Sequence, residues 1–127
     1  DIQSVIFNFL ENKDAVHLAS TCKFFEKWAN KLFSIKFKKK GDQNFRKQSY
    51  QTAFLYYTTA INFGRRTKRD PILYSNRSAA NYKLGRYSSA LIDATFAVRL
   101  NPKWIKGYVR MAKAYEGSKQ YDNARIC

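Results

Sequence analysis

The sequence contains few of the residues that carry out acid–base or metal chemistry. Its 127 residues include one His, two Cys and nine Asp or Glu. Cys22 and Cys127 form neither a disulfide framework nor a metal-ligand spacing, and no Gly-rich phosphate loop is present. The single His17 stands between Val16 and Leu18, where a structural histidine is the ordinary interpretation. We therefore predict a protein that is not an enzyme and that needs neither a metal nor another cofactor.

Long apolar runs are also missing. The longest are far below the ~18 residues that a membrane span requires, so no membrane span is expected. Two cysteines without a pairing pattern suit a reducing compartment, and we predict a cytoplasmic location, with a nuclear one as the alternative. The chain starts without Met and stops within a repeated pattern at Cys127, so both ends read as cut points.

The sequence is strongly basic. The net charge is +15. Residues 1–34 hold four basic and four acidic groups, so residues 35–127 carry the whole excess. Such a surface attracts anionic partners and raises their association rate at low salt. Nucleic acid or anionic lipid is one such partner class, although aromatic residues committed to helix packing leave few for base stacking.

A repeat with a period near 34 residues organises the second part of the chain. Tyr50, Tyr87 and Tyr121 are 37 and 34 residues apart, and Ala53, Ala90 and Ala124 share those intervals. A fixed period of this length, with small residues where helices must touch, is typical of a helical-hairpin array. The segment LYSNRSAANYKLGRYSSALIDATFAVRLNPKW resembles a tetratricopeptide repeat. The fold class predicted from it is all-α, with about two and a half repeats at 33–63, 72–101 and 104–127.

The helices expected in this array end at recognisable signals. Helices are predicted at 33–47, 51–63, 73–84 and 88–100 and from 104 to Glu116 or Gly117, and a further helix opens near Tyr121. Gly64 is a plausible C-cap, and Asn101-Pro102 ends a helix because the residue before Pro avoids the helical region. The interval from Ala53 to Ala90 is 37 residues, three more than 34, and the extra residues fall in the basic loop 65–70. This loop is either a solvated turn or an element that contacts an anion.

The N-terminal segment 1–32 is predicted as a separate three-helix unit. The order DIQSVIFNFLENKDAVHLASTCKFFEKWAN resembles an F-box, with a helix ending in IFxxL, a turn, and an aromatic helix capped at Ser20-Thr21. That resemblance implies binding to a Skp-family adaptor of a ubiquitin ligase. The residues it assigns to adaptor binding are Ile2, Val5, Ile6, Leu10 and Phe25. A three-helix lid that caps the array would produce a similar pattern.

A set of polar residues on the first helices of the repeats resembles the carboxylate clamp of chaperone-binding tetratricopeptide domains. The resemblance implies that the acidic C-terminal peptide of a heat-shock chaperone binds in a concave groove. The carboxylate-binding positions are Lys38, Asp42, Asn76, Lys106 and Arg110. The groove-lining positions are Phe45, Arg46, Ala79, Tyr82, Lys83 and Lys113.

Asp42 departs from this pattern, because the family has Asn there. An Asn amide donates to a carboxylate, whereas an ionised Asp only accepts and repels it. Lys38, four residues earlier on the expected helix, is placed to pair with Asp42 and soften that repulsion. Asp42 could alternatively select a partner that presents an amide or a cation. Three hypotheses therefore stand: a module for acidic C-terminal peptides, an F-box adaptor, and a binder of nucleic acid or anionic lipid.

Overall fold

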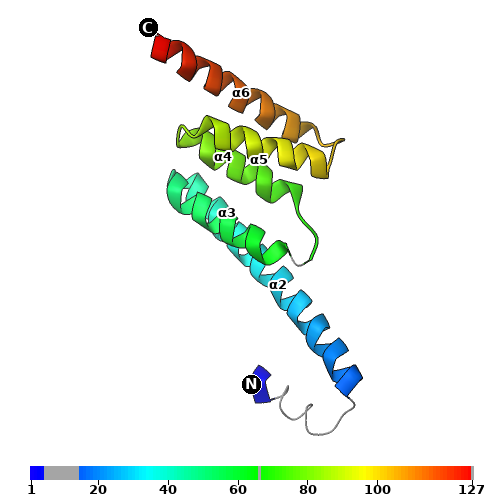
Figure 1. Cartoon of the computed structure of the whole chain (residues 1–127). Coiled ribbons are helices and arrows are strands. Elements are labelled where there is room, and N and C mark those ends of the chain that lie inside the picture. The colour runs from blue at the N-terminus through cyan, green and yellow to red at the C-terminus, as the bar shows by residue number, and fades with distance from the viewer. Residues whose placement is uncertain (5–14, 66, 127) are drawn as a thin grey trace.

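The computed structural model describes residues 1–4, 15–65 and 67–126, and the side chains of 1–4, 21–65 and 67–120. Its main elements are the helices α2 (Ala15–Arg46), α3 (Tyr50–Gly64), α4 (Pro71–Lys83), α5 (Tyr87–Leu100) and α6 (Ile105–Ile126). Each helix packs on the next along the chain, and α4 also contacts α6 (Figure 1). The described residues therefore form the all-α hairpin array that the repeat predicts. None of the helices in these ranges combines the length and the apolar character that a membrane crossing requires.

The first helix is much longer than the sequence predicts. α2 runs without a break through Ser20-Thr21 and through the predicted boundary between residues 32 and 33. The helix starts predicted at these two places are wrong. The physical reason is that no Pro or Gly occurs from Ala15 to Lys40, so the backbone ladder continues past residues that could otherwise have capped a helix.

The F-box-like arrangement of three short helices is therefore not found in residues 15–46. Of the predicted adaptor-binding residues, Ile2 and Phe25 are exposed, and the Phe25 ring packs edge-on against Trp28 of the same helix. Val5, Ile6 and Leu10 lie outside the described residues. The first half of α2 extends beyond α3 (Figure 1), and its exposed apolar side chains include Phe24 and Trp28.

The last helix is also longer than predicted. α6 continues to Ile126, so the separate helix expected to open near Tyr121 is wrong. Gly117, which the pattern placed at a helix end, lies within α6 and is buried. A Cβ at Gly117 would come within 2.6 Å of the Tyr87 ring. This glycine therefore permits close packing of α6 on α5 and does not mark a turn.

The turns within and between hairpins follow local backbone rules. Gln48 and Gly85 have φ of 63° and 75°, in the left-handed region, and they fall in the turns between α2 and α3 and between α4 and α5. α4 begins with Pro71 directly after Asp70, whose carboxylate accepts from the Ile72 N–H at 2.9 Å. This cap fixes the start of α4 immediately after the basic loop.

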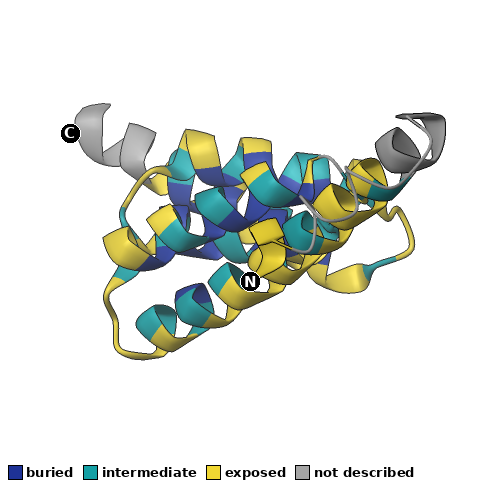
Figure 2. Cartoon of the chain, turned by 90° about the horizontal axis from the view of Figure 1, so that it is seen from below, coloured by how far each residue is buried: buried dark blue, intermediate teal, exposed yellow. Residues whose placement is uncertain are grey.

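Small residues lie where the helices touch. Ala53, Ala60, Ala80, Ala90 and Ala97 have no exposed surface. Buried residues gather on the sides of the helices that face one another, and the outer sides are exposed (Figure 2). Side chains without bulk let the helix axes approach closely, and aromatic rings fill the remaining space, as in the parallel stacking of Phe37 on Phe63 with centroids 5.7 Å apart.

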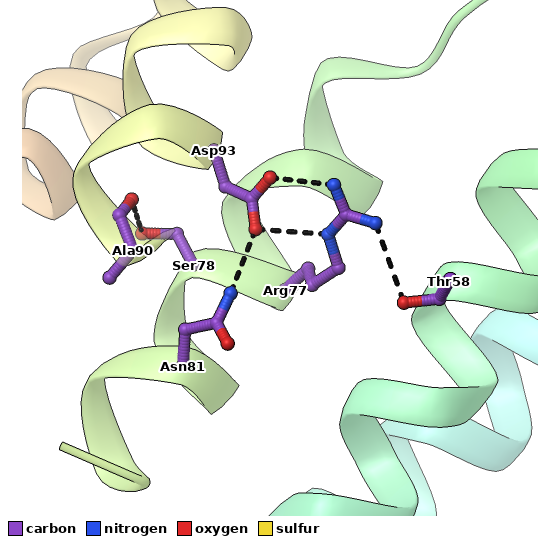
Figure 3. A network of polar contacts seen from close by, with 6 residues as sticks. All are labelled: Thr58, Arg77, Ser78, Asn81, Ala90 and Asp93. Atoms are coloured by element: carbon purple, nitrogen blue, oxygen red, sulfur yellow. Dashed lines mark hydrogen bonds and ion pairs between the residues drawn. The ribbon is translucent and has the colours of Figure 1, made fainter. Parts of the chain in front are cut away.

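A buried ion pair joins α4 to α5. The guanidinium of Arg77 donates to both carboxylate oxygens of Asp93, at 2.9 and 2.7 Å (Figure 3). Asn81 donates to the same carboxylate at 3.0 Å, and Arg77 reaches Thr58 of α3 at 3.4 Å. The Asp93 side chain is only 7% exposed. Its charge is therefore neutralised within the fold by a bidentate pair, which also fixes the relative position of three helices.

Replacement of Asp93 by Asn tests this network. The substitution keeps the shape but leaves the Arg77 charge without its partner in a mostly buried place. We expect the free energy of unfolding to fall by about 2–4 kcal/mol. Urea unfolding followed by circular dichroism measures it. Glu116→Gln, at an exposed position of α6, removes the same charge and should change stability by less than about 0.5 kcal/mol. Equal effects of the two substitutions would contradict the role given to Asp93.

Candidate functional site

A cavity of about 200 Å³ lies where three first helices of successive hairpins meet. α2 contributes Asp42, Phe45 and Arg46, α4 contributes Asn76 and Ala79, and α6 contributes Arg110. Tyr57 of α3 completes the wall. The spacing of these residues places them on one side of each helix, since positions three and four apart share a face. We call this the Asp42 cavity.

The structure brings together some of the predicted site residues and separates others. Asp42, Asn76 and Arg110 of the predicted carboxylate-binding set line the Asp42 cavity, as do Phe45, Arg46 and Ala79 of the predicted groove-lining set. The predicted residues outside its lining are Lys38, Tyr82, Lys83, Lys106 and Lys113. Of these, Lys83, Lys106 and Lys113 are exposed on the surface. Tyr82 packs edge-on against Tyr87 of α5, with ring centroids 5.5 Å apart.

Asp42 is held by two hydrogen bonds to the same oxygen. The Tyr57 hydroxyl donates to Asp42 Oδ1 at 2.6 Å, and the Asn76 amide donates to that atom at 3.3 Å. Asp42 makes no ion pair with any residue that the structure describes. The pairing with Lys38 expected from their spacing is therefore absent, and the nearby Lys40 lies over the rings of Phe37 and Tyr56.

The Tyr57 hydroxyl is a permanent donor to this carboxylate. Tyr57 is only 2% exposed, and its ring lies against Gly41, where a Cβ would come within 2.5 Å of it. Burial raises the pKa of the Tyr57 phenol far above its ordinary value, and the hydrogen bond to Asp42 and the negative charge there raise that pKa further. The positive charges of Arg46 and Arg110 lower the pKa by less. The hydroxyl thus stays protonated throughout the physiological range.

The two guanidinium groups of the cavity are available to a ligand. Neither Arg46 nor Arg110 forms an ion pair or a side-chain hydrogen bond within the described part of the chain. A guanidinium presents N–H donors in a planar fork that matches a carboxylate. The Asp42 cavity therefore combines two unpaired cations, an amide, the Phe45 ring and one carboxylate, a set suited to an anionic group with an apolar neighbour.

Sequence reasoning missed the part that Tyr57 plays in this site. Its position four residues after Ala53 predicts a contact between helices, and the Tyr57 ring does lie in the core. The available signal was that a buried Tyr needs a partner for its hydroxyl. Gly41 removes the side chain that would separate the ring from α2, and Asp42 is the next residue. No group of three His, Cys, Asp or Glu residues in the described ranges could hold a metal ion.

A larger hollow of about 510 Å³ lies beside the middle of α2. Its apolar lining includes Phe24, Trp28 and Ile35, and Lys68 of the basic loop contributes a charge. In the same loop, the Arg69 guanidinium lies 5.6 Å from the centre of the Phe96 ring. The Arg69 side chain thus packs on the array. Arg65 is exposed, and Arg66 lies outside the described residues.

Comparison with known proteins identifies the fold. No protein-family model matches the chain. The TPR domain of Arabidopsis OM64 superimposes with a TM-score of 0.66 and 29% identity, covering 75% of this chain and 76% of that one. The TPR2AB domain of yeast Sti1, solved in complex with pHSP90, gives a TM-score of 0.65 and 27% identity, covering 85% of this chain and 42% of that one. The described residues therefore have the tetratricopeptide-repeat fold.

The chain is also similar to part of several curated proteins. Hsp70-Hsp90 organizing protein 2 of Arabidopsis thaliana is 41% identical over 87 residues, which are 68% of this chain and 15% of that protein. The chain spans 14–15% of the length of this and two further curated relatives. The similarity thus concerns a tetratricopeptide-repeat domain of these proteins and not their whole length.

Replacement of Tyr57 by Phe tests the bond that holds Asp42. The variant loses a hydrogen bond to a charged acceptor at a largely buried position. We expect the free energy of unfolding to fall by about 1–2 kcal/mol, measured by urea unfolding. Tyr56→Phe is the matched control, because the Tyr56 hydroxyl has no hydrogen bond within the described residues. If the two variants were equally stable, the Tyr57 hydroxyl would have no structural role.

Proposed function

We propose that this tetratricopeptide-repeat chain is a non-catalytic interaction module that binds an acidic C-terminal peptide, such as the tail of a heat-shock chaperone. The observation that carries the proposal is the Asp42 cavity, in which Arg46 and Arg110 have no partner within the described residues. Arg46 is exposed and Arg110 is partly buried, so an anion in the cavity can bind both guanidinium groups in place of water. A terminal carboxylate has the charge and the planar geometry to do so.

Each cavity residue has a role in this proposal. Arg110 and Arg46 donate hydrogen bonds to the peptide carboxylate, and Asn76 donates its remaining amide hydrogen to it. Phe45 contacts an apolar side chain of the peptide. The predicted residues outside the cavity contribute differently. Lys38, Lys83, Lys106 and Lys113 supply positive potential around the entrance, which increases the rate of encounter with an acidic peptide. A dissociation constant of about micromolar, ~−8 kcal/mol, is expected.

The comparisons support a chaperone tail as the partner. The chain resembles domains of Hsp70-Hsp90 organizing proteins, and yeast Sti1 was solved with pHSP90 bound to its TPR2AB domain. A cytoplasmic location, where such partners act, agrees with the proposal. No observation favours the ligase-adaptor hypothesis, since α2 runs without a break where the second and third of its three short helices were expected. Nucleic-acid binding is less favoured, because several rings that could stack on bases are packed between helices.

A peptide with a free C-terminus should bind more tightly than its amidated twin. The amide keeps the shape but removes the charge that the two arginines recognise. We expect a loss of about tenfold or more, measured by isothermal titration at fixed salt. The chaperone-tail proposal predicts that a peptide copying a cytosolic heat-shock chaperone terminus binds in this way. Equal affinities for the acid and the amide would reject the proposed function.

Arg110→Gln should lower the affinity for the same peptide by about tenfold, because Gln cannot offer a charged bidentate fork. Arg99→Gln on α5 is the matched control. Its side chain is exposed and lies outside the cavity, so the same loss of charge should change affinity by less than about twofold. Lys106→Gln should give an intermediate effect, mostly in the association rate. If Arg99→Gln weakened binding as much as Arg110→Gln, net charge and not the cavity would explain the affinity.

A further inference from the structure

Asp42 places a negative charge in a cavity whose other charged groups are positive. Asp93 offers the contrast within the same molecule, because a bidentate contact with Arg77 neutralises its charge inside the fold (Figure 3). Asp42 has no ion pair within the described residues and forms part of the cavity wall. Its charge therefore acts on whatever group enters the cavity.

The hydrogen bonds of Asp42 leave one oxygen for a ligand. Oδ1 accepts from both the Tyr57 hydroxyl and the Asn76 amide, whereas Oδ2 accepts from no described residue. A carboxylate oxygen accepts hydrogen bonds and does not donate them. A ligand atom that meets Oδ2 must therefore be a donor, and a second carboxylate at that place would be repelled by Asp42.

The charges of the cavity lead to the same requirement. Arg46 and Arg110 contribute two positive charges and Asp42 one negative charge, so a ligand with one carboxylate neutralises the site. A second ligand carboxylate would exceed the charge available and would lie beside Asp42. Two carboxylates side by side repel one another, and the cavity lining offers no third cation to offset that repulsion.

We propose that Asp42 determines which peptide ends the site accepts. The site selects peptides whose last residue has a single carboxylate, the one at the end of the main chain. The side chain of that last residue carries an N–H donor, as Asn does. It discriminates against a last residue with a second carboxylate, as in Asp. This inference rests on the proposed function and narrows its ligand class to C-terminal peptides that are acidic along their length but end in a donor side chain.

Asp42→Asn is the sharpest test that the cavity offers. Because the Tyr57 hydroxyl binds Oδ1, an Asn at this position keeps its carbonyl oxygen there and places its amide nitrogen where Oδ2 was. One acceptor becomes a donor, and the charge at that place disappears. The variant should therefore lose the preference for a donor side chain without losing the recognition of the main-chain carboxylate.

The experiment titrates two acidic peptides that differ only in the last residue, Asn or Asp, both with free C-termini. A third peptide is the Asn form with an amidated C-terminus. We expect the parent protein to bind the Asn form about tenfold more tightly than the Asp form, and the amidated form weakly. Asp42→Asn should abolish or reverse that ratio. Glu116→Gln, which changes the net charge equally at an exposed position, should leave the ratio unchanged.

The possible failures are distinguishable. If the parent binds the Asp form as tightly as the Asn form, or if Asp42→Asn keeps the parental ratio, the selectivity is overturned while the proposed function stands. If the parent binds none of the peptides, or binds the acid and the amide alike, the proposed function is rejected and the selectivity with it. The ratio of the two affinities is measured on the parent protein, so this part of the test does not depend on any variant folding. Circular dichroism with urea unfolding shows whether Asp42→Asn is folded.

Discussion

The close approach of neighbouring helices is the constraint on which the rest of this molecule depends. Alanines without exposed surface occupy the contacts between helices, and Gly41 lets the ring of Tyr57 lie directly on α2. Residues with larger side chains at these places would separate the helices by more than the reach of a hydroxyl. Because the spacing is small, the same ring that fills the core of the first hairpin also delivers a hydrogen bond to Asp42. Packing and site are thus one arrangement.

The hairpin array and every residue of the cavity lining except Tyr57 could be predicted from the sequence. The period near 34 residues, the alanines and the Asn-Pro stop are local signals, and they indicated the turns at Gly85 and at Asn101-Pro102. Positions on one face of successive first helices follow from helical geometry, and this geometry is enough to place Asp42, Asn76 and Arg110 in one group. The fold required no knowledge of long-range contacts beyond the repeat itself.

The rest depended on distances between helices, which a pattern does not contain. The bond from Tyr57 to Asp42 and the separation of Lys106 from the cavity lining are set by where side chains end, not by their spacing in sequence. The two long helices were missed for another reason. Ser20-Thr21 and Gly117 are possible helix ends, but a helix continues through such residues unless the backbone has a better partner. At Gly117, the rings of Tyr87 and Tyr82 occupy the space that a side chain would otherwise fill.

The unbroken length of α2 has a consequence for direction. Trp28 and Asp42 are fourteen residues apart on this helix, a distance of about 21 Å along its axis and a difference of only about 40° around it. The exposed indole therefore lies on nearly the same side of α2 as the wall of the cavity. Because the helix is continuous, one residue inserted directly after Trp28 would turn the indole by about 100° relative to Asp42. Ser34 and Phe37, which contact α3, lie beyond that point and would keep their register with Asp42.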